Sequence, residues 1–507
     1  MSGKLASIVL FAAIAGCATA QVTAPAVVGV SNGADFSLRL APGALAAVFG
    51  SNFGSGPALS VTATVGGKQA YVINVTPAQL TLQIPTDVPA GTANLVVTVG
   101  GASSTPFPVT LDAVSPTIFS ANGSGSGLGL IRTSANANVT NIAPAKPGDN
   151  LVAYAIGLGP TNPPTLTGTA PTSANPTVSP ATLTVGGLPA TITYAGIAPG
   201  LVATFQVNFT VPAGLQGTQP VVLTIGGKSS SPVGLALFGI GSVVNNASFA
   251  SAGTASPGSI VSVFANGIGS TDQSLGFPAT TFQGVSVSFN GTPAPIFHLT
   301  ASQGQIDLLV PYELPTSGNV SVQLKTSTST SLNYMLAMSP AAPGLYFLAD
   351  PSTKGRFNVL AQFNNTVWLA MPEAMAAALK IPSGCTASNL NPLTLCGQPA
   401  APGDFLVLYT TGLGKATPDG DPNGAQLKTG DIPPADASVL YKTVATPAVT
   451  VGGLPAMVVF SGIAPGFPGL YQLDFQVPAG VTGDDVPVAV SIGGSPADTR
   501  TIAIRSR

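Results

Sequence analysis

The sequence predicts an all-β protein of four tandem antiparallel β-sandwiches in an A-B-A′-B′ duplication, with one short helix inserted in the last unit. Three observations predict this architecture: few charged residues among many Gly and Pro, a strand motif that occurs four times, and two kinds of unit that alternate along the chain. A chain of 507 residues is long enough for several domains, each with its own core.

Charged residues are scarce. Asp, Glu, Lys and Arg make up 7% of the chain, against about 25% in an average soluble protein, whereas Gly (60) and Pro (47) are abundant. Only two Glu occur, Glu313 and Glu373, so strands and turns are favoured over helices, which need charged residues on their exposed faces. The formal charge of −2 comes from scattered residues, and without a basic stripe we expect no nucleic-acid partner.

A segment that begins with Gln and ends with Pro six residues later occurs four times. Its apolar residues fall at every second position, which is typical of a strand with one face in a core, and Pro ends the strand because it cannot donate to a continuing ladder. A Gly-Gly or Asn-Gly pair precedes each copy and predicts a tight hairpin. The four copies therefore predict four immunoglobulin-like sandwiches of about 100 residues each. The Gln segments are 79–85, 206–212, 305–311 and 472–478.

The four copies fall into two kinds. The first and third share an opening motif, at 31–36 and 245–249, followed by Pro-Gly and an apolar strand. The second and fourth share Pro-Gly-Asp followed by Gly-Leu-Gly, which indicates duplication of a two-unit block. We expect unit A at 21–113, unit B at 114–239, unit A′ at 240–341 and unit B′ at 342–507.

From Asn245 onward these motifs resemble the Solibacter-type uncharacterised C-terminal domain of exported acidobacterial proteins, and single units resemble IPT/TIG-type immunoglobulin-like domains. The resemblance implies this fold and export. It implies no catalytic residues, because the family has no established biochemical activity. The matching segments include 246–249, 257–260, 402–404, 409–414, 451–453, 461–466 and the strand that begins at Gln472.

The first twenty residues predict export. Lys4, an apolar run over 5–15 and Ala18-Thr19-Ala20 predict a signal peptide at 1–20, cleaved before Gln21. Alternatively, the small residues before Cys17 fit a lipoprotein that is anchored at that cysteine. Either way we expect an exported protein that is extracellular, periplasmic or at the cell surface. No later segment contains eighteen consecutive apolar residues, so we expect no transmembrane segment after the signal.

Unit B′ is longer than unit B before its Pro-Gly-Asp motif. The step from Pro343 to Pro402 is 59 residues, against 31 from Pro116 to Pro147. The insert, at about 367–398, holds the only Trp, a helix expected at 372–380 with Pro at its first position, and two cysteines. We expect these cysteines, Cys385 and Cys396, to form a disulfide because an exported protein passes through an oxidising compartment.

Two segments of unit B′ are candidate ligand sites. Trp368, with Phe363 and Met371, predicts an aromatic recognition surface, and the alternative is that Trp368 packs the inserted helix against the sandwich. The second segment begins Asp419-Gly-Asp421-Pro-Asn423, which resembles the start of a calcium loop, with Asp431 near its far end. Gly430 stands where a bidentate Glu is expected, so a polar turn is the alternative.

The sequence predicts no enzyme and no catalytic residues. Its only histidine, His298, lies in a strand-like segment, and no nucleophile motif occurs. We therefore expect a non-enzymatic structural or adhesive protein, with surface or matrix proteins, glycans or copies of itself as partners. The alternative is a carbohydrate- or polymer-binding protein that serves extracellular enzymes. Calcium is the one cofactor that the sequence suggests.

Overall fold

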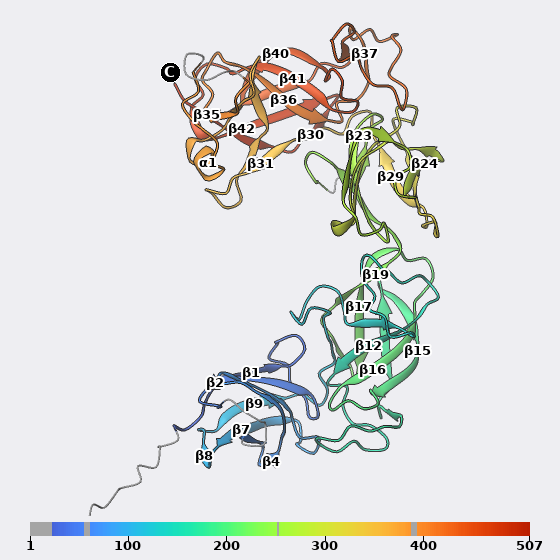
Figure 1. The fold of residues 1–507 in the computed structure, drawn as a ribbon, viewed down its shortest axis with the longest axis vertical. Coiled ribbons are helices and arrows are strands. Elements are labelled where there is room, and N and C mark those ends of the chain that lie inside the picture. The colour runs from blue at the N-terminus through green and yellow to red at the C-terminus, as the bar shows by residue number, and fades with distance from the viewer. Residues whose placement is uncertain (1–22, 55–60, 251–252, 387–392, 507) are drawn as a thin grey trace, which may run out of the picture.

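The computed structural model describes residues 23–54, 61–250, 253–386 and 393–506, and their regular structure is nearly all β-strand (Figure 1). The all-β class and the four sandwich units are confirmed. The units follow one another in a curved row, with the first and last units on the same side of the row (Figure 1). The predicted signal peptide and Cys17 lie outside the described residues.

Unit A consists of two packed sheets. The Gln strand lies inside the first sheet, and its Leu80 and Leu82 point into the core between the sheets, where they are almost fully buried. The first sheet has the order β1 (Ala26–Asn32), β2 (Leu45–Ser51), β6 (Gln79–Gln83) and β5 (Tyr71–Val75). The second has β4 (Lys68–Gln69), β3 (Val61–Val65), β7 (Gly91–Val99) and β8 (Ala102–Ser103), with β9 (Phe107–Leu111) on β7.

Unit A′ repeats this arrangement. Its first sheet has the order β20 (Gly239–Asn245), β22 (Ile260–Asn266), β27 (Gln305–Leu309), β26 (Ile296–Thr300) and β23 (Gln273–Ala279). Its second has β21 (Thr254–Ala255), β29 (Tyr334–Met338), β28 (Asn319–Lys325), β24 (Ser286–Phe289) and β25 (Thr292–Pro293). The predicted strand at His298 is β26, and a short 3-10 turn over Ala301–Gln303 follows it.

In unit B one long strand joins the two layers. β15 (Leu188–Ile197) pairs with β14 (Ala181–Val185) near its start and with β16 (Phe205–Thr210) over most of its length. The other strands are β10 (Thr117–Ile118), β11 (Ile131–Thr133), β12 (Asn150–Ile156), β13 (Asn175–Pro176), β17 (Gly217–Ile225), β18 (Lys228–Ser229) and β19 (Val233–Leu237).

Unit B′ uses β40 (Leu454–Ile463) in the same way, between β39 (Ala448–Val451) and β41 (Tyr471–Gln476). Its other strands before β39 are β30 (Gly344–Leu345), β31 (Phe347–Ala349), β32 (Phe357–Val359), β33 (Ala361–Phe363), β34 (Trp368–Ala370), β35 (Cys396–Gln398), β36 (Phe405–Thr411), β37 (Ala416–Pro418) and β38 (Tyr441–Thr443). Those after β41 are β42 (Gly483–Ile492), β43 (Ser495–Pro496) and β44 (Arg500–Ile504).

Each Gln strand lies between two antiparallel partners, and one of those partners contains a bulge. β6, β16, β27 and β41 pair with β5, β15, β26 and β40, and the register of each pair shifts by one residue near its middle. The extra residue bends the strand, so the same local twist occurs in all four units. The shifts lie between Val72 and Asn74, Ile192 and Tyr194, Ile296 and His298, and Val458 and Phe460.

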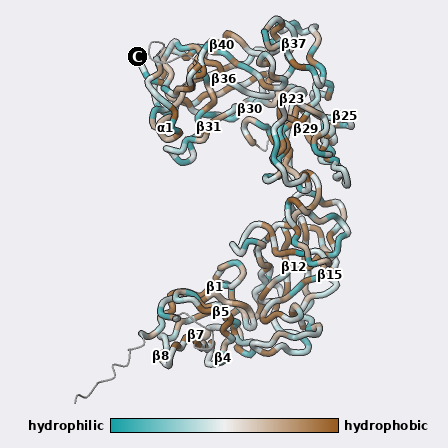
Figure 2. The backbone as a smooth tube through the Cα atoms, in the orientation of Figure 1, coloured by the Kyte–Doolittle hydropathy of each residue, from teal (hydrophilic) through white to brown (hydrophobic). Residues whose placement is uncertain are grey.

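Each unit has its own apolar core. Separate clusters of buried residues lie in units A, B, A′ and B′, and apolar segments alternate with polar ones along the chain in all four (Figure 2). Burial of each cluster stabilises its unit independently of the others. Within the described residues, no helix has the length and apolar character needed to cross a bilayer.

The inserted helix is present but shorter than predicted. α1 (Glu373–Ala378) is a six-residue helix, and Pro372 precedes it with an extended ψ of 143°, as an N-cap rather than the first helical residue. Lys380 has a positive φ of 57°, a backbone conformation that cannot continue a helix. The predicted span of 372–380 therefore includes both ends of the helix as well as the helix itself.

Candidate functional site

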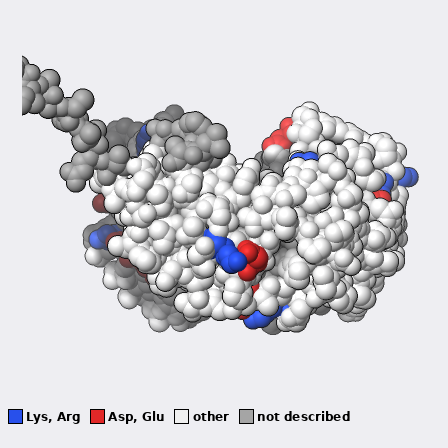
Figure 3. All heavy atoms as spheres, turned by 90° about the horizontal axis from the view of Figure 1, so that it is seen from below, with Lys and Arg blue, Asp and Glu red and all other residues white. Residues whose placement is uncertain are grey.

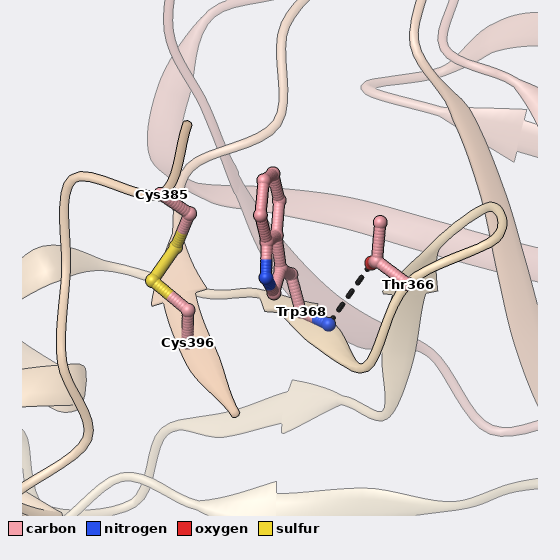
Figure 4. The surroundings of a disulfide bond; sticks show 4 residues. All are labelled: Thr366, Trp368, Cys385 and Cys396. Carbon is pink, nitrogen blue, oxygen red and sulfur yellow. Dashed lines mark hydrogen bonds between the residues drawn. A yellow bond between two sulfur atoms is a disulfide. The ribbon is translucent and has the colours of Figure 1, made fainter. Parts of the chain in front are cut away.

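The insert in unit B′ is tied down by the predicted disulfide, which is confirmed. Cys385 and Cys396 are bonded, with their Cα atoms 6.0 Å apart, and the Trp368 ring lies beside them (Figure 4). The backbone N–H of Trp368 donates to the Thr366 hydroxyl at 3.0 Å. β34, which carries Trp368, pairs with β35, which carries Cys396, so sheet pairing and the disulfide hold the same two segments together.

The predicted recognition residues lie in the interior. Trp368 and Phe363 are each 8% exposed and belong to the core of unit B′, together with both cysteines. Met371 is fully buried against Met375 of α1. Trp368 and Phe363 also line a hollow of about 600 Å³ beside Glu373 and Cys385. With only 8% of each side chain exposed, their burial agrees with the packing alternative for Trp368.

The carboxylates of the Asp419 segment do not converge. Asp419 forms an ion pair with Lys442 at 3.2 Å, Asp421 accepts a hydrogen bond from the backbone N–H of Asn423 at 2.9 Å, and Asp431 accepts one from that of Lys428 at 2.8 Å. Throughout the described ranges, no three His, Cys, Asp or Glu side chains are grouped so that they could hold a metal ion. Calcium binding therefore stays a prediction of the sequence alone.

The same segment contacts the neighbouring unit through Thr429. The backbone N–H of Tyr312 in unit A′ donates to the Thr429 hydroxyl at 3.0 Å. Thr429 in turn donates to the carboxylate of Glu313, from its backbone N–H at 2.9 Å and from its hydroxyl at 2.5 Å. Burial alone would raise the pKa of Glu313, but the hydrogen bonds from Thr429 outweigh it and hold that pKa below its ordinary value.

Units A and B make the equivalent contact. The backbone N–H of Thr86 donates to the Thr167 hydroxyl at 3.0 Å, and the two hydroxyls lie 3.3 Å apart. Counting from the Gln strands, Thr86 corresponds to Tyr312, and Thr167 precedes Gly168 as Thr429 precedes Gly430. We call these two contacts the threonine latches.

The residue after each latch position differs between the two pairs. Asp87, which corresponds to Glu313, forms an ion pair with Lys68 of its own unit at 3.0 Å. In this pair the backbone N–H of Gly168, beside Thr167, donates instead to the side-chain oxygen of Gln83 at 2.7 Å. The one unusual feature of Glu313 in the sequence is that it is one of only two Glu in the chain. The sequence could not identify Thr429 as the partner, because the two residues are 116 positions apart.

An asparagine at the start of each block forms a second contact between paired units. The Asn32 amide donates to the Thr117 hydroxyl of unit B at 3.0 Å, and its oxygen accepts from the backbone N–H of Ala34 at 2.9 Å. Asn245 makes the same turn with Ala247 at 2.9 Å and donates to the carbonyl of Ala342 at 2.9 Å. These buried amides fix the opening motif of each A unit against the start of each B unit.

The space beneath the latches is filled in one pair and hollow in the other. Between A′ and B′ it holds a buried apolar cluster that includes Leu309, Tyr312, Leu413, Leu427, Ile463 and Tyr471. Between A and B a cavity of about 420 Å³ opens instead, lined by residues that include Gly43, Gln83, Thr86, Thr165, Ile197 and Phe205. Few charges mark the face of the molecule seen in Figure 3. This cavity between units is a pocket that the sequence did not predict.

The comparisons with known proteins identify one unit. The IPT/TIG domain model matches residues 40–113, most of unit A, so the resemblance to IPT/TIG-type domains is confirmed there. The resemblance of the second half to the Solibacter-type domain is not confirmed and stays a prediction. No curated protein matches the chain significantly.

Several solved structures resemble the chain weakly. The plexin A4 extracellular region is 10% identical with a TM-score of 0.26, and the match covers 95% of this chain and 31% of that one. SGBP-B from a xyloglucan utilization locus in Bacteroides uniformis is 13% identical with a TM-score of 0.18, and the match covers 62% of this chain and 100% of that one. The Escherichia coli adhesin FdeC is 11% identical with a TM-score of 0.16, and the match covers 62% of this chain and 96% of that one. The chain thus spans about a third of the plexin, and scores this low carry no argument about function.

Proposed function

We infer that this is a non-enzymatic structural or adhesive protein of the cell surface or extracellular space, built from two rigid two-unit blocks. The observation that carries the proposal is that the threonine latch occurs at corresponding positions in both pairs. The corresponding asparagines, Asn32 and Asn245, also each donate to the start of the B unit of their own pair. Contacts that fix the orientation of neighbouring sandwiches suit a protein that holds surfaces at defined distances. Its partners are surface or matrix proteins and other copies of the chain.

The junction between the blocks is also short. One residue, Phe238, separates β19 of unit B from β20 of unit A′. The Asn266 amide of A′ donates to the Thr218 hydroxyl of unit B at 3.2 Å, and the Gly267 N–H donates to the carbonyl of Asn141 at 2.8 Å. A junction without a linker restricts bending between the blocks, which supports a semi-rigid row of units over tethered, independently moving units.

Export is part of the proposal. The Cys385–Cys396 disulfide fits an exported protein, since such bonds persist in oxidising compartments. The low charge of the chain suits contact with other proteins. Trp368 is buried and offers little exposed ring surface on which a sugar could stack. We therefore do not propose glycan binding as a second function.

Surface proteolysis of intact cells tests the proposal. Protease added outside the cell should cut the protein in its exposed loops while a cytoplasmic control protein stays intact. Complete protection of this protein, with cleavage restored after lysis, would argue against surface display. A matched measurement of cell aggregation or surface attachment in cells that lack the protein tests the structural or adhesive part.

A further inference from the structure

The cavity between units A and B has a filled counterpart in the same molecule. Its lining residues Gln83 and Thr86 correspond to Leu309 and Tyr312, because each pair stands at the same distance from its Gln strand. On the side of unit B, Ile197 and Phe205 correspond to Ile463 and Tyr471 by the same count. All four counterparts belong to the apolar cluster between A′ and B′. The two spaces therefore have walls at corresponding positions. They differ in whether side chains fill them and in one polar wall residue, since Gln83, which accepts a hydrogen bond from the Gly168 N–H, stands where Leu309 does.

Two side chains account for much of the filling. Tyr312 is 5% exposed where the cavity has Thr86, and Leu427 is 5% exposed where the latch alignment places Thr165. The Tyr312 ring packs against Gly258, where a Cβ atom would lie 2.2 Å from the ring. The corresponding Gly43 is also a glycine, with the same φ of 75°, and it lines the cavity. In unit A the Thr86 methyl group takes only part of the place of the ring, since a Cβ atom at Gly43 would lie 3.2 Å from Thr86 Cγ2.

The first pair also keeps a glycine carbonyl that accepts a hydrogen bond in the second pair. The Tyr471 hydroxyl donates to the carbonyl of Gly414 at 2.5 Å. In the first pair Phe205 replaces Tyr471 and has no hydroxyl, and the corresponding Gly159 lines the cavity. Phe205 therefore cannot give the Gly159 carbonyl the hydrogen bond that Tyr471 gives to Gly414. A hydroxyl on a bound ring can donate that bond instead.

We propose that the cavity between units A and B binds a phenolic ring, which occupies the space that Tyr312 and Leu427 fill in the second pair. The volume of about 420 Å³ lies within the range of about 300–1,000 Å³ that is usual for ligand pockets, which often form between domains. The ring packs on Gly43 and Phe205, and its hydroxyl donates to the carbonyl of Gly159. The second pair, already filled by its own side chains, does not bind.

Binding of p-cresol to the full chain tests the proposal, measured by calorimetry and by ligand-observed NMR. We expect one p-cresol to bind per chain. Thr86→Tyr introduces the ring that the second pair contains and should weaken binding by at least about tenfold while raising the melting temperature. The latch survives this change because it uses the backbone N–H, as Tyr312 does with Thr429. Thr165→Leu fills the cavity from its opposite wall and should also weaken binding. It replaces Thr86→Tyr as the test if that variant does not fold.

Two controls make the result specific. Thr62→Tyr adds the same ring at an exposed position of β3, away from the cavity, and should leave binding unchanged. Toluene lacks the hydroxyl and should bind about fivefold to tenfold more weakly than p-cresol. N-acetyltyrosinamide distinguishes a tyrosine side chain of a partner from a free phenol as the source of the ring. The proposal is wrong if p-cresol does not bind, or if Thr86→Tyr and Thr165→Leu leave its affinity unchanged.

Discussion

The carboxylate of Glu313 in unit A′ accepts two hydrogen bonds from Thr429 in unit B′, from the backbone N–H at 2.9 Å and from the hydroxyl at 2.5 Å. The two residues are 116 positions apart, and the bonds join the two units of the second block. The Asp419 segment, whose sequence resembles a calcium loop, therefore forms a contact between two units.

The Glu313 contact should make the second block sensitive to acid. Because the folded-state pKa of Glu313 lies below its ordinary value, its contribution to stability is present above pH 4.5 and is lost as the pH falls through the folded-state pKa. At pH 7, Glu313→Gln should lower the free energy of unfolding by about 0.5–1 kcal/mol, a modest value because the carboxylate is exposed. Calorimetry at pH 7 and at several acid pH values checks this, since the difference should shrink as the pH falls through the folded-state pKa. Asp87→Asn is the matched control in the first block, and an equal loss there would contradict the special role of Glu313.

Removal of the Thr429 hydroxyl should open the second latch alone. Thr429→Ala leaves the Tyr312 N–H without its acceptor, so we expect that amide to exchange with deuterium at least about tenfold faster. Thr429→Ser keeps the hydroxyl and should keep the protection. Thr167→Ala should affect the amide of Thr86 and leave that of Tyr312 unchanged. Protection of Tyr312 that survives Thr429→Ala would show that the latch does not restrain this contact.

Replacement of Trp368 distinguishes packing from recognition. Trp368 is 8% exposed, so Trp368→Ala should destabilise unit B′ by about 3–5 kcal/mol, as is usual for a large buried ring. Trp368→Phe fills more of the space and should cost less. Thermal unfolding followed by near-ultraviolet circular dichroism measures both. Unchanged stability together with loss of a binding activity would support the recognition surface instead.

The disulfide should stabilise the insert locally. The cysteines are 11 residues apart, and closure of so short a loop contributes about 3 kcal/mol in the chain-entropy model. The double change Cys385→Ser and Cys396→Ser should therefore lower the melting temperature of unit B′ and expose α1 to protease. The first block, which lies far from the insert, should melt as before. Loss of stability in all four units would contradict a local role.

A calcium titration decides between the two interpretations of the Asp419 segment. Since its carboxylates are engaged with Lys442 and with backbone N–H groups, we expect millimolar calcium to leave the melting temperature unchanged. Calorimetry should show no heat of binding. A calcium-dependent rise in melting temperature that Asp421→Asn abolishes would restore the prediction of a calcium loop.

The strands could be predicted because their signals are local. Alternation of apolar residues from Leu80 to Ile84 and the Pro that follows are enough to define a strand and its end. The bulges could not be predicted, since one extra residue between Val458 and Phe460 interrupts alternation without a distinctive residue type. The sequence predicts the helix in the right place but puts Pro372 at its first helical position, whereas Pro372 is the N-cap, because Pro suits both positions.

The contacts between units could not be predicted at all. They depend on which loop meets which after four sandwiches have folded, and a single sequence holds no signal for such distant pairs. The exposure of Trp368 is a similar case. An aromatic residue beside an apolar segment suits a binding surface or a core, and only packing against β35 and the disulfide decides which.

The single residue between β19 and β20 has a mechanical consequence. A chain pulled from its two ends cannot lengthen there by straightening a linker, because Phe238 is itself buried in the core of unit A′. Force therefore passes from one sheet directly into the next. Extension under load must begin with the rupture of contacts between units or the unfolding of a whole sandwich, so the molecule should lengthen in discrete steps.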